Sequence, residues 1–320
     1  MQVALKPAIN IQNLSKTYKS RNGEAIHAVN HLDLQIDTGQ VFGFLGANGA
    51  GKTTTIKMMC GLVKPTSGDV YLNGYHVHKD RRKAMTQIGA VLEGTRNVYW
   101  RLSAWENILY FGRLKGVHGK SLKQRAELLL HELDLWERRN DKIRTFSRGM
   151  QQKVAIACAL ISDPPIVLLD EPTLGLDVKA ALTVKEWIAR LAEERRKTII
   201  LTTHQLDMAQ ELCHRVAIIN KGQLMTNLPT SELLDLARTE YYEIKVDGYL
   251  NGSADAFEAR NLTIHSDDTT TTLTGAVQQS DLYDVLDNLR QAGHALVSVK
   301  PIEPNLEDVF MKYIDTEQAS

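Results

Sequence analysis

The stretch GANGAGKT, at residues 46–53, combines glycines with a lysine and a threonine at fixed spacing. Its order matches G-x-x-x-x-G-K-[ST], in which glycines let backbone N–H groups turn inward around phosphates. In this chemistry Lys52 reaches the β and γ phosphates of a nucleoside triphosphate, and the Thr53 hydroxyl binds Mg²⁺. The candidate phosphate ligands are Gly46, Ala47, Asn48, Gly49, Ala50, Gly51, Lys52, Thr53 and Thr54.

A second candidate group follows the apolar run IVLLDEP, at residues 166–172. A buried strand would deliver Asp170 to its end, where a carboxylate can hold Mg²⁺. Neighbouring residues at a strand end point differently, so Glu171 would face an attacking water. Such an acidic pair alone is compatible with a solvent-facing strand end. Together with the glycine-rich stretch it predicts a nucleoside triphosphatase.

The identity of the base is less clearly marked. Guanine-reading enzymes use N-K-x-D, and the stretch at residues 220–223, NKGQ, lacks the aspartate. Tyr18 lies upstream of the glycine-rich stretch, after a strand, where its ring could stack on adenine. Taken alone, a tyrosine at this position is more often a surface aromatic residue.

TFSRGMQQK, at residues 145–153, reads as the start of a helix, with Ser147 and Gly149 just before or within it. Backbone N–H groups at a helix start attract anions. The chain therefore carries a second candidate anion site, about a hundred residues after the first.

Bulk composition limits the class of protein. The 320 residues have a formal net charge of zero, which argues against nucleic acid as a partner. The three cysteines show no metal-ligand or disulfide spacing, which fits a reducing cytosol. We expect no signal peptide, and no stretch approaches the ~18 apolar residues of a membrane helix. If the protein works at a membrane, another chain must span it.

The elements that must position these residues alternate along the chain. Apolar runs at 41–46, 166–169, 198–203 and 215–220 predict buried strands, and helical spacing separates them. This alternation favours a mostly parallel sheet. Residues 100–137 favour helices, as an insertion into the sheet domain. Beyond about residue 236 we expect a small second domain of βαβ character, ending in a short helix over 305–314.

In combination, these motifs resemble the ATP-binding subunit of an ABC transporter, of the bacterial multidrug or polymer exporter type with a separate membrane permease. The resemblance covers roughly residues 8–235, and six motifs occur in the family's order. They are the adenine-stacking aromatic (Tyr18), Walker A (46–53), the signature (FSRGMQQ), Walker B (Asp170 and Glu171), the D-loop (LGLD, ending at Asp177) and the switch histidine (His204).

The resemblance implies a fold and a division into domains. It implies an α/β P-loop NTPase (RecA-like) core with an antiparallel β subdomain and a helical insertion over roughly 95–153. This ATP-binding domain would span 1–236. Residues 237–320 would form a small C-terminal accessory α+β domain, whose role in dimer stabilisation or regulation stays open.

The resemblance also implies a mechanism with ATP and Mg²⁺ as cofactors. Two ATP-binding subunits pack head to tail, so Ser147 and Gly149 of one subunit contact the γ-phosphate held by the other. Glu171 would activate or orient water, and His204 would contact the γ-phosphate. The partner ATPase is a second copy or a related subunit.

Three positions depart from the family pattern or leave alternatives open. Glu93 stands where the family has a glutamine, and its carboxylate would bind Mg²⁺ or water. Arg148 replaces a common glycine, and either adds a cation near the partner's phosphate or points into solvent. The aromatic residues after Glu93, above all Tyr99 and Trp100, either grip a helix of the permease or pack the core of the insertion.

Two other functions within this family fit the sequence less well. A soluble ABC ATPase acting on ribosomes or nucleic acid would carry two cassettes or a long coiled-coil insertion, and this chain shows neither. An importer ATPase fits the signature and tail less well. We therefore expect an ATPase that powers export, located in the cytoplasm on the inner face of the cell membrane. The exported substrate would bind the permease and stays open.

Overall fold

The computed structural model describes residues 6–20, 22–94, 97–237, 241–250, 262–267, 269–276, 279–302, 305–307 and 309–310. The chain forms two compact units, Met1–Thr230 and Ser231–Ser320. The division lies at the start of helix α8 (Thr230–Ala237), whereas the boundary expected after residue 236 lies near the end of this helix. Within the described residues, no helix is long and apolar enough to cross a membrane.

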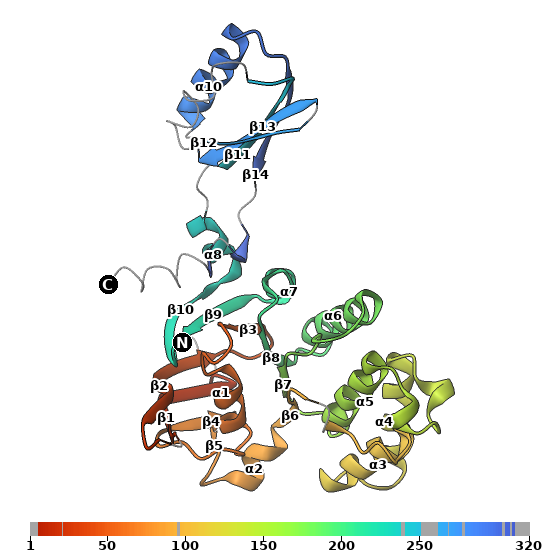
Figure 1. Cartoon of the computed structure of the whole chain (residues 1–320). Helices are drawn as coiled ribbons and strands as arrows, with labels where there is room; N and C mark the ends of the chain where they lie inside the picture. Colours follow the sequence, from red (N-terminus) through yellow and green to blue (C-terminus); the bar gives the residue numbers. More distant parts are fainter. Residues whose placement is uncertain are drawn as a thin grey trace, which may run out of the picture. The chain divides into compact units, whose positions relative to one another are not determined.

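A six-stranded sheet, ordered β10-β9-β3-β8-β7-β6, forms the centre of the first unit (Figure 1). Its five strands from β9 to β6 run parallel, and β10 pairs antiparallel with β9. Every residue of the three middle strands is buried, as the continuous apolar runs predict. The strands are β3 (Val41–Leu45), β6 (Ile88–Val91), β7 (Ile166–Asp170), β8 (Thr198–Thr203), β9 (Arg215–Asn220) and β10 (Gln223–Pro229).

A second sheet of the first unit is antiparallel, in the order β2-β1-β4-β5. Helix α1 (Lys52–Met59) joins the two sheets, because its Ile56 and Met59 lie in one buried cluster with Ile9 of β1 and Phe42 of β3. This packing fixes the start of α1 relative to the central sheet. The remaining elements are β1 (Ile9–Lys19), β2 (Ala25–Ile36), β4 (Ser67–Leu72), β5 (Tyr75–His76) and α2 (Arg81–Thr86).

The chain between β6 and β7 is helical, and α3, α4 and α5 lie together beside that edge of the sheet (Figure 1). The insertion packs closely on the sheet, because a Cβ on Gly89 of β6 would lie 2.2 Å from the carbonyl oxygen of Ala159 in α5. The helices are α3 (Ala104–Leu114), α4 (Gly119–Glu132) and α5 (Arg148–Leu160), with 3₁₀ turns at Trp136–Arg138 and Ile143–Thr145. Helices α6 (Val178–Glu193) and α7 (Leu206–Leu212) connect the next strands.

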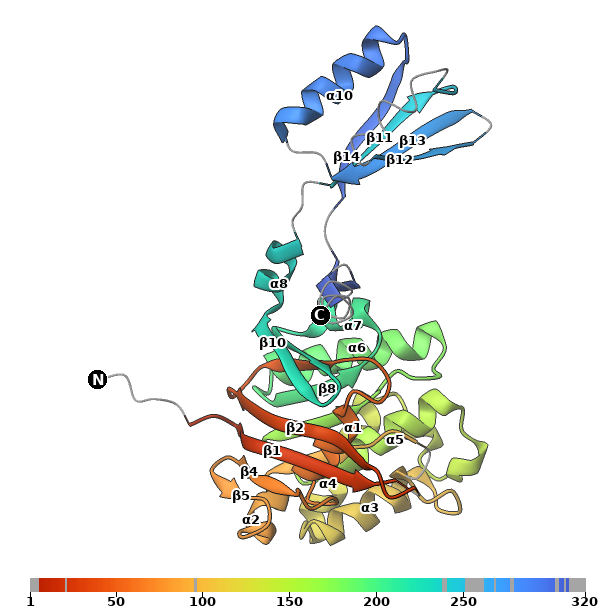
Figure 2. The same ribbon diagram turned by 60° about the vertical axis from the view of Figure 1, so that its left-hand side comes forward.

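The second unit is a four-stranded antiparallel sheet, ordered β12-β13-β11-β14, with helix α10 beside it (Figure 2). Because β11 pairs antiparallel with both β13 and β14, these two strands run parallel, and α10 connects them across β11. The expected βαβ unit is thus a split one. The elements are β11 (Tyr241–Asp247), β12 (Leu262–Ser266), β13 (Thr270–Ala276), α10 (Gln279–Gln291) and β14 (Leu296–Ile302). Of the helix expected over 305–314, residues 306–307 and 309–310 are helical, and residues 308 and 311–314 lie outside the described residues.

The α/β fold with an antiparallel sheet and a helical insertion is confirmed. Ion pairs reinforce the junction between the insertion and the core. Asp163, just before β7, accepts from Arg125 of α4 and from Lys197, which precedes β8, both at 2.7 Å. Arg195 pairs with Glu132 at the end of α4. Burial alone would raise the pKa of Asp163, but the bonds from Arg125 and Lys197 outweigh it and lower the pKa to about 2.

We expect Asp163→Asn to destabilise the protein at pH 7, because Arg125 and Lys197 lose a carboxylate partner. The folded-state pKa of about 2 lies below the ordinary value of 3.8, so this stabilisation is present above pH 3.8 and is lost as the pH falls toward 2. Urea unfolding of both proteins from pH 7 down to pH 3 measures it. A difference in unfolding free energy that stays constant over this range would contradict the assignment.

Candidate functional site

The glycine-rich loop joins β3 to α1, and close contacts explain its glycines. Gly51 has φ of 108°, and a Cβ there would lie 2.3 Å from the carbonyl oxygen of Ala28. A Cβ on Gly46 would lie 2.4 Å from the carbonyl oxygen of Ile219. No side chain fits at either position without moving backbone atoms. The loop therefore presents backbone groups to the space in front of α1.

Lys52 opens α1 and is almost fully buried. Its ammonium donates to the carbonyl oxygens of Gly46, at 2.7 Å, and Ala47, at 3.2 Å. Burial lowers the pKa of Lys52, while the charges of Glu171, Asp170 and Glu93 act in the opposite direction. The site thus places one buried cation, held by its own loop, opposite three carboxylates.

Adjacent parallel strands bring the separate motifs together. In the sheet β8 lies between β3 and β7, and its register pairs Thr203 with Leu45 and Thr202 with Asp170. The Thr202 hydroxyl donates to Asp170 Oδ1, and the Thr53 hydroxyl donates to the same oxygen at 3.3 Å. The backbone N–H of Glu93 donates to Asp170 Oδ2 at 3.4 Å. Asp170 is therefore fixed from three directions, at the carboxyl ends of the strands.

Glu171 is held in an unusual backbone conformation, with φ of 50°. Its N–H donates to the carbonyl oxygen of Thr202 at 3.0 Å and lies 3.2 Å from the Thr202 hydroxyl. Its side chain is only 9% exposed, and Oε1 lies 3.0 Å from Nδ1 of His204. Thr202 thus supports both acidic residues. Sequence reasoning missed it, although a hydroxyl near the end of the apolar run TIILTT was a usable signal.

A pocket of about 520 Å³ opens in front of the glycine-rich loop. Ala28 and Leu174 line it too, beside residues expected from the sequence: Asn48, Gly49, Ala50, Gly51, Lys52, Thr53, Thr54, Glu93, Glu171 and His204. Tyr18 is not among its lining residues. The Tyr18 ring lies on β1, 39% exposed, with the ammonium of Lys16 5.0 Å from its centre.

The remaining predicted ligands lie at two neighbouring helix starts. Ser147 caps α5 by accepting from the N–H of Met150 at 3.3 Å, and Asp177 caps α6 by accepting from the N–H of Ala180 at 2.9 Å. A Cβ on Gly149 would lie 2.6 Å from Cβ of Ala180, so this glycine allows α5 and α6 to approach. None of these predicted ligands lines the 520 Å³ pocket.

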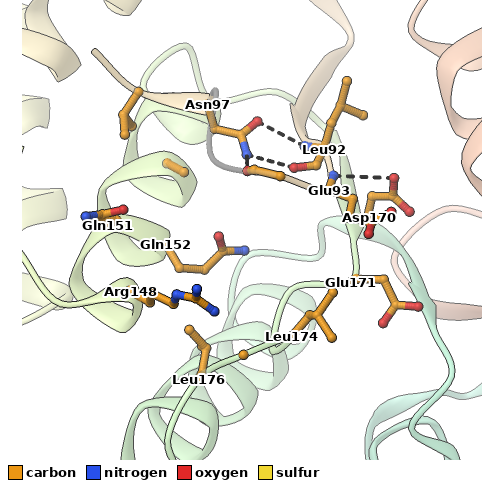
Figure 3. Close-up of a pocket in the computed structure, with 14 residues that line it drawn as sticks. Leu92, Glu93, Asn97, Arg148, Gln151, Gln152, Asp170, Glu171, Leu174 and Leu176 are labelled. Carbon is orange, nitrogen blue, oxygen red and sulfur yellow. Dashed lines mark hydrogen bonds between the residues drawn. The ribbon is translucent and has the colours of Figure 1, made fainter. Parts of the chain in front are cut away.

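A second cavity, of about 350 Å³, lies between the Glu171 loop and the start of α5 (Figure 3). It shares Glu93, Glu171 and Leu174 with the first pocket. Arg148 and Gln152 extend into it from α5. On its far side Asn97 bonds both the N–H and the carbonyl oxygen of Leu92, at 3.2 and 2.7 Å. This clamp holds the segment that carries Glu93.

The aromatic residues after Glu93 divide into surface and packed groups. Tyr99 and Trp100 are 48% and 49% exposed. The Tyr99 ring also contacts Tyr110, with ring centres 5.1 Å apart, whereas Trp105 packs against Trp136 inside the insertion. The two residues expected to face a partner are thus available at the surface.

We expect Thr202→Val to lower the rate of nucleotide hydrolysis about 10- to 100-fold, because Asp170 loses a donor and Glu171 loses part of its support. The turnover number of purified protein measures this. Thr198→Val is the matched control: its buried hydroxyl accepts from the N–H of Gly39 at the other end of β8. We expect this control to affect stability but not turnover. Equal losses of turnover in both variants would contradict the role of Thr202.

Comparison with known proteins places this geometry in a family. The family model "ABC transporter" matches residues 29–174, and a domain of unknown function (DUF8691) matches residues 241–300. The ABC transporter ATP-binding protein NatA of Bacillus subtilis is 36% identical over 232 residues, covering 72% of this chain and 94% of NatA. The bacitracin transport ATP-binding protein BcrA of Bacillus licheniformis is 32% identical over 309 residues, covering 96% and 97%.

The solved structures include a dimeric post-hydrolysis state of an ATP-binding cassette bound to ADP and Pi. It superposes with a TM-score of 0.63 at 30% identity, covering 69% of this chain and 98% of that one. The chain therefore belongs to the ABC transporter ATP-binding proteins, and it is the ATP-binding and ATP-hydrolysing subunit of an exporter-type transporter.

Proposed function

We propose that the chain powers export through a separate membrane permease by ATP-driven, head-to-tail dimerisation. Residues 46–54, Glu171 and His204 would serve the ATP of their own chain. Ser147, Gly149 and Asp177 would serve the ATP of a second subunit. One observation supports this division of residues between two ATP molecules. Both groups belong to one folded unit, but Ser147, Gly149 and Asp177 do not line the 520 Å³ pocket in front of the glycine-rich loop.

The triphosphate would replace bonds that the loop now makes internally. The Lys52 ammonium already lies in place, buried and bonded to two carbonyl oxygens of the loop. Exchange of these acceptors for phosphate oxygens needs little side-chain ordering. Charge-assisted bonds from Lys52 and from the backbone N–H groups would then stabilise the negative charge that develops in the reaction.

Glu171 would act as the base or orienting group for the attacking water. Its carboxylate is nearly buried, borders both cavities and is paired with His204, which holds one of its oxygens. The His204 side chain is 46% exposed and also borders the nucleotide pocket. This arrangement leaves the imidazole able to contact the γ-phosphate and to hold Glu171.

The residues present also fit Mg²⁺. The Thr53 hydroxyl and the Asp170 carboxylate lie together, and Glu93 borders the same space, so hard oxygen ligands are available. No group of three or more His, Cys, Asp or Glu residues suited to a metal occurs among the described residues. A site of few protein ligands completed by phosphates suits Mg²⁺. The ion, when bound, would neutralise phosphate charge, with Thr53, Asp170 and Glu93 as its candidate protein ligands.

We propose that the Tyr18 ring stacks on the adenine of ATP. Its ring is partly exposed, which supports stacking, although it lies outside the phosphate pocket. The similarity to transporter subunits supports a partner that spans the membrane. Such a partner would place this chain on the cytoplasmic face of the membrane. Tyr99 and Trp100 would contact that permease. Zero net charge and the likeness to transport proteins disfavour ribosomes and nucleic acid.

We expect Glu171→Gln to lower turnover at least about 100-fold while ATP binding persists, because the amide cannot accept a proton from water. The variant should then accumulate as an ATP-bound dimer, measured by size-exclusion chromatography with light scattering. The double variant Lys52→Ala, Glu171→Gln is the control and should stay monomeric. Normal turnover in Glu171→Gln would refute the role of Glu171, and a monomer at saturating ATP would refute ATP-driven dimerisation.

The permease is tested by pull-down of the tagged chain from gently solubilised membranes, with mass spectrometry. We expect a stoichiometric multi-span membrane protein, weakened by Tyr99→Ala with Trp100→Ala because apolar contact area is lost. Leu128→Ala, which removes an exposed apolar residue of α4, serves as the matched control. Recovery of ribosomes or nucleic acid instead would overturn the transport proposal and leave the ATPase chemistry intact.

A further inference from the structure

Arg148 is a cation in an unexpected place. It is the first residue of α5, directly after the cap Ser147, where the helix dipole disfavours positive charge. Its guanidinium makes no hydrogen bond or ion pair with any residue that the structure describes. It extends into the 350 Å³ cavity, whose lining includes the carboxylates of Glu93, Asp170 and Glu171 (Figure 3). The acidic lining favours this direction for the side chain.

The tip of Arg148 lies against the backbone of the loop that follows Glu171. A Cβ on Gly175 would lie only 3.0 Å from Arg148 Nη1, and Gly175 has φ of 71°. Glycine is thus needed there for the backbone conformation, and it leaves room for a planar guanidinium on the loop.

Hydrogen bonds connect this contact to Glu171. The N–H of Leu174 donates to the carbonyl oxygen of Glu171, and the N–H of Leu176 donates to that of Thr173, each at 3.2 Å. The hydroxyl of Thr173 donates to Gln205 Oε1 at 2.8 Å. These overlapping turns connect Gly175 to Glu171, so a side chain in contact with Gly175 acts on Glu171 through them. Glu171 needs such support, because its φ of 50° is unfavourable for a residue with a side chain.

We propose that Arg148 is a positioning residue for ATP hydrolysis in its own chain. Its guanidinium holds the 173–176 loop and thereby the orientation of Glu171, an inference that rests on the proposed role of Glu171. Arg148 adjoins Ser147, which would contact the partner's ATP. Arg148 therefore links two sites. One is the helix start at Ser147, which would contact the partner's ATP, and the other is Glu171, which would act on the ATP of the same chain.

Kinetics of Arg148→Ala in the full-length chain test the positioning role. We expect kcat to fall about tenfold, a fraction of what a general base contributes, with the KM for ATP unchanged. Arg148→Lys should recover little of this loss, since an ammonium lacks the planar group. Arg144→Ala, which removes an exposed cation four residues earlier, is the matched control and should keep normal kcat. A normal kcat in Arg148→Ala would overturn the proposal.

Mixed dimers decide which ATP Arg148 serves. In a mixed dimer of Arg148→Ala and Lys52→Ala, the Lys52→Ala chain binds no ATP. The one nucleotide then lies in the chain that lacks Arg148, so we expect no recovery of activity over Arg148→Ala alone. Ser147→Arg mixed with Lys52→Ala should recover activity, because the second chain supplies an intact Ser147. Recovery in the Arg148 mixture would overturn the proposal and assign Arg148 to the partner's ATP. Absence of recovery in the Ser147 mixture would instead count against the head-to-tail arrangement.

A double-mutant cycle tests the contact without relying on dimers. Gly175→Ala places a methyl group 3.0 Å from Arg148 Nη1, so it disturbs the same contact as Arg148→Ala, and the two effects on kcat should be less than additive. Fully additive losses would refute the contact. Normal turnover in Glu171→Gln would remove the proposed function itself, and that result is separate from every outcome for Arg148.

Discussion

The hydroxyl and carbonyl groups of Thr202 join β7 and β8 at the strand ends that carry Asp170 and Glu171. The hydroxyl donates to Asp170, and the carbonyl oxygen accepts the N–H of Glu171. Both interactions depend on the parallel register of β7 and β8, which pairs Asp170 with Thr202. A shift of one residue would turn the hydroxyl to the other face of the sheet and remove the support of both acidic residues. The chemistry therefore depends on burial of the strands that fix this register.

Charge balance is the second constraint on the site. Three carboxylates face one buried lysine, and their effect on the Lys52 pKa opposes that of burial. The Lys52 ammonium donates to two carbonyl oxygens of its own loop, and these bonds hold the loop around it. Glu93 adds a negative charge where an amide would be neutral. The excess of negative charge favours binding of a further cation at this site, and Mg²⁺ would supply it.

Local motifs were predictable because their chemistry is contained in a few consecutive residues. The glycine-rich loop, Asp170 with Glu171, and the helix start at Ser147 were each recognisable in this way. Contacts that depend on tertiary register were not. The support from Thr202 requires two strands to be aligned, and the need for glycine at 149 arises from Ala180, on another helix. Resemblance supplied the role of His204, whereas its bond to Glu171 emerged only from the fold.

Gly149 lies where two helix starts pack together, and both starts carry proposed contacts to the partner's ATP. Its lack of a side chain brings the start of α5 against the start of α6, so Ser147 and Asp177 lie on neighbouring helix ends. Asp177 in turn ends the short loop that begins at Glu171. A ligand that orders the start of α5 would therefore also restrict this loop, through Ala180 on one side and Gly175 on the other. Because the two proposed half-sites of a chain share this packed unit, nucleotide bound at one would alter the binding free energy of the other without a separate signalling element.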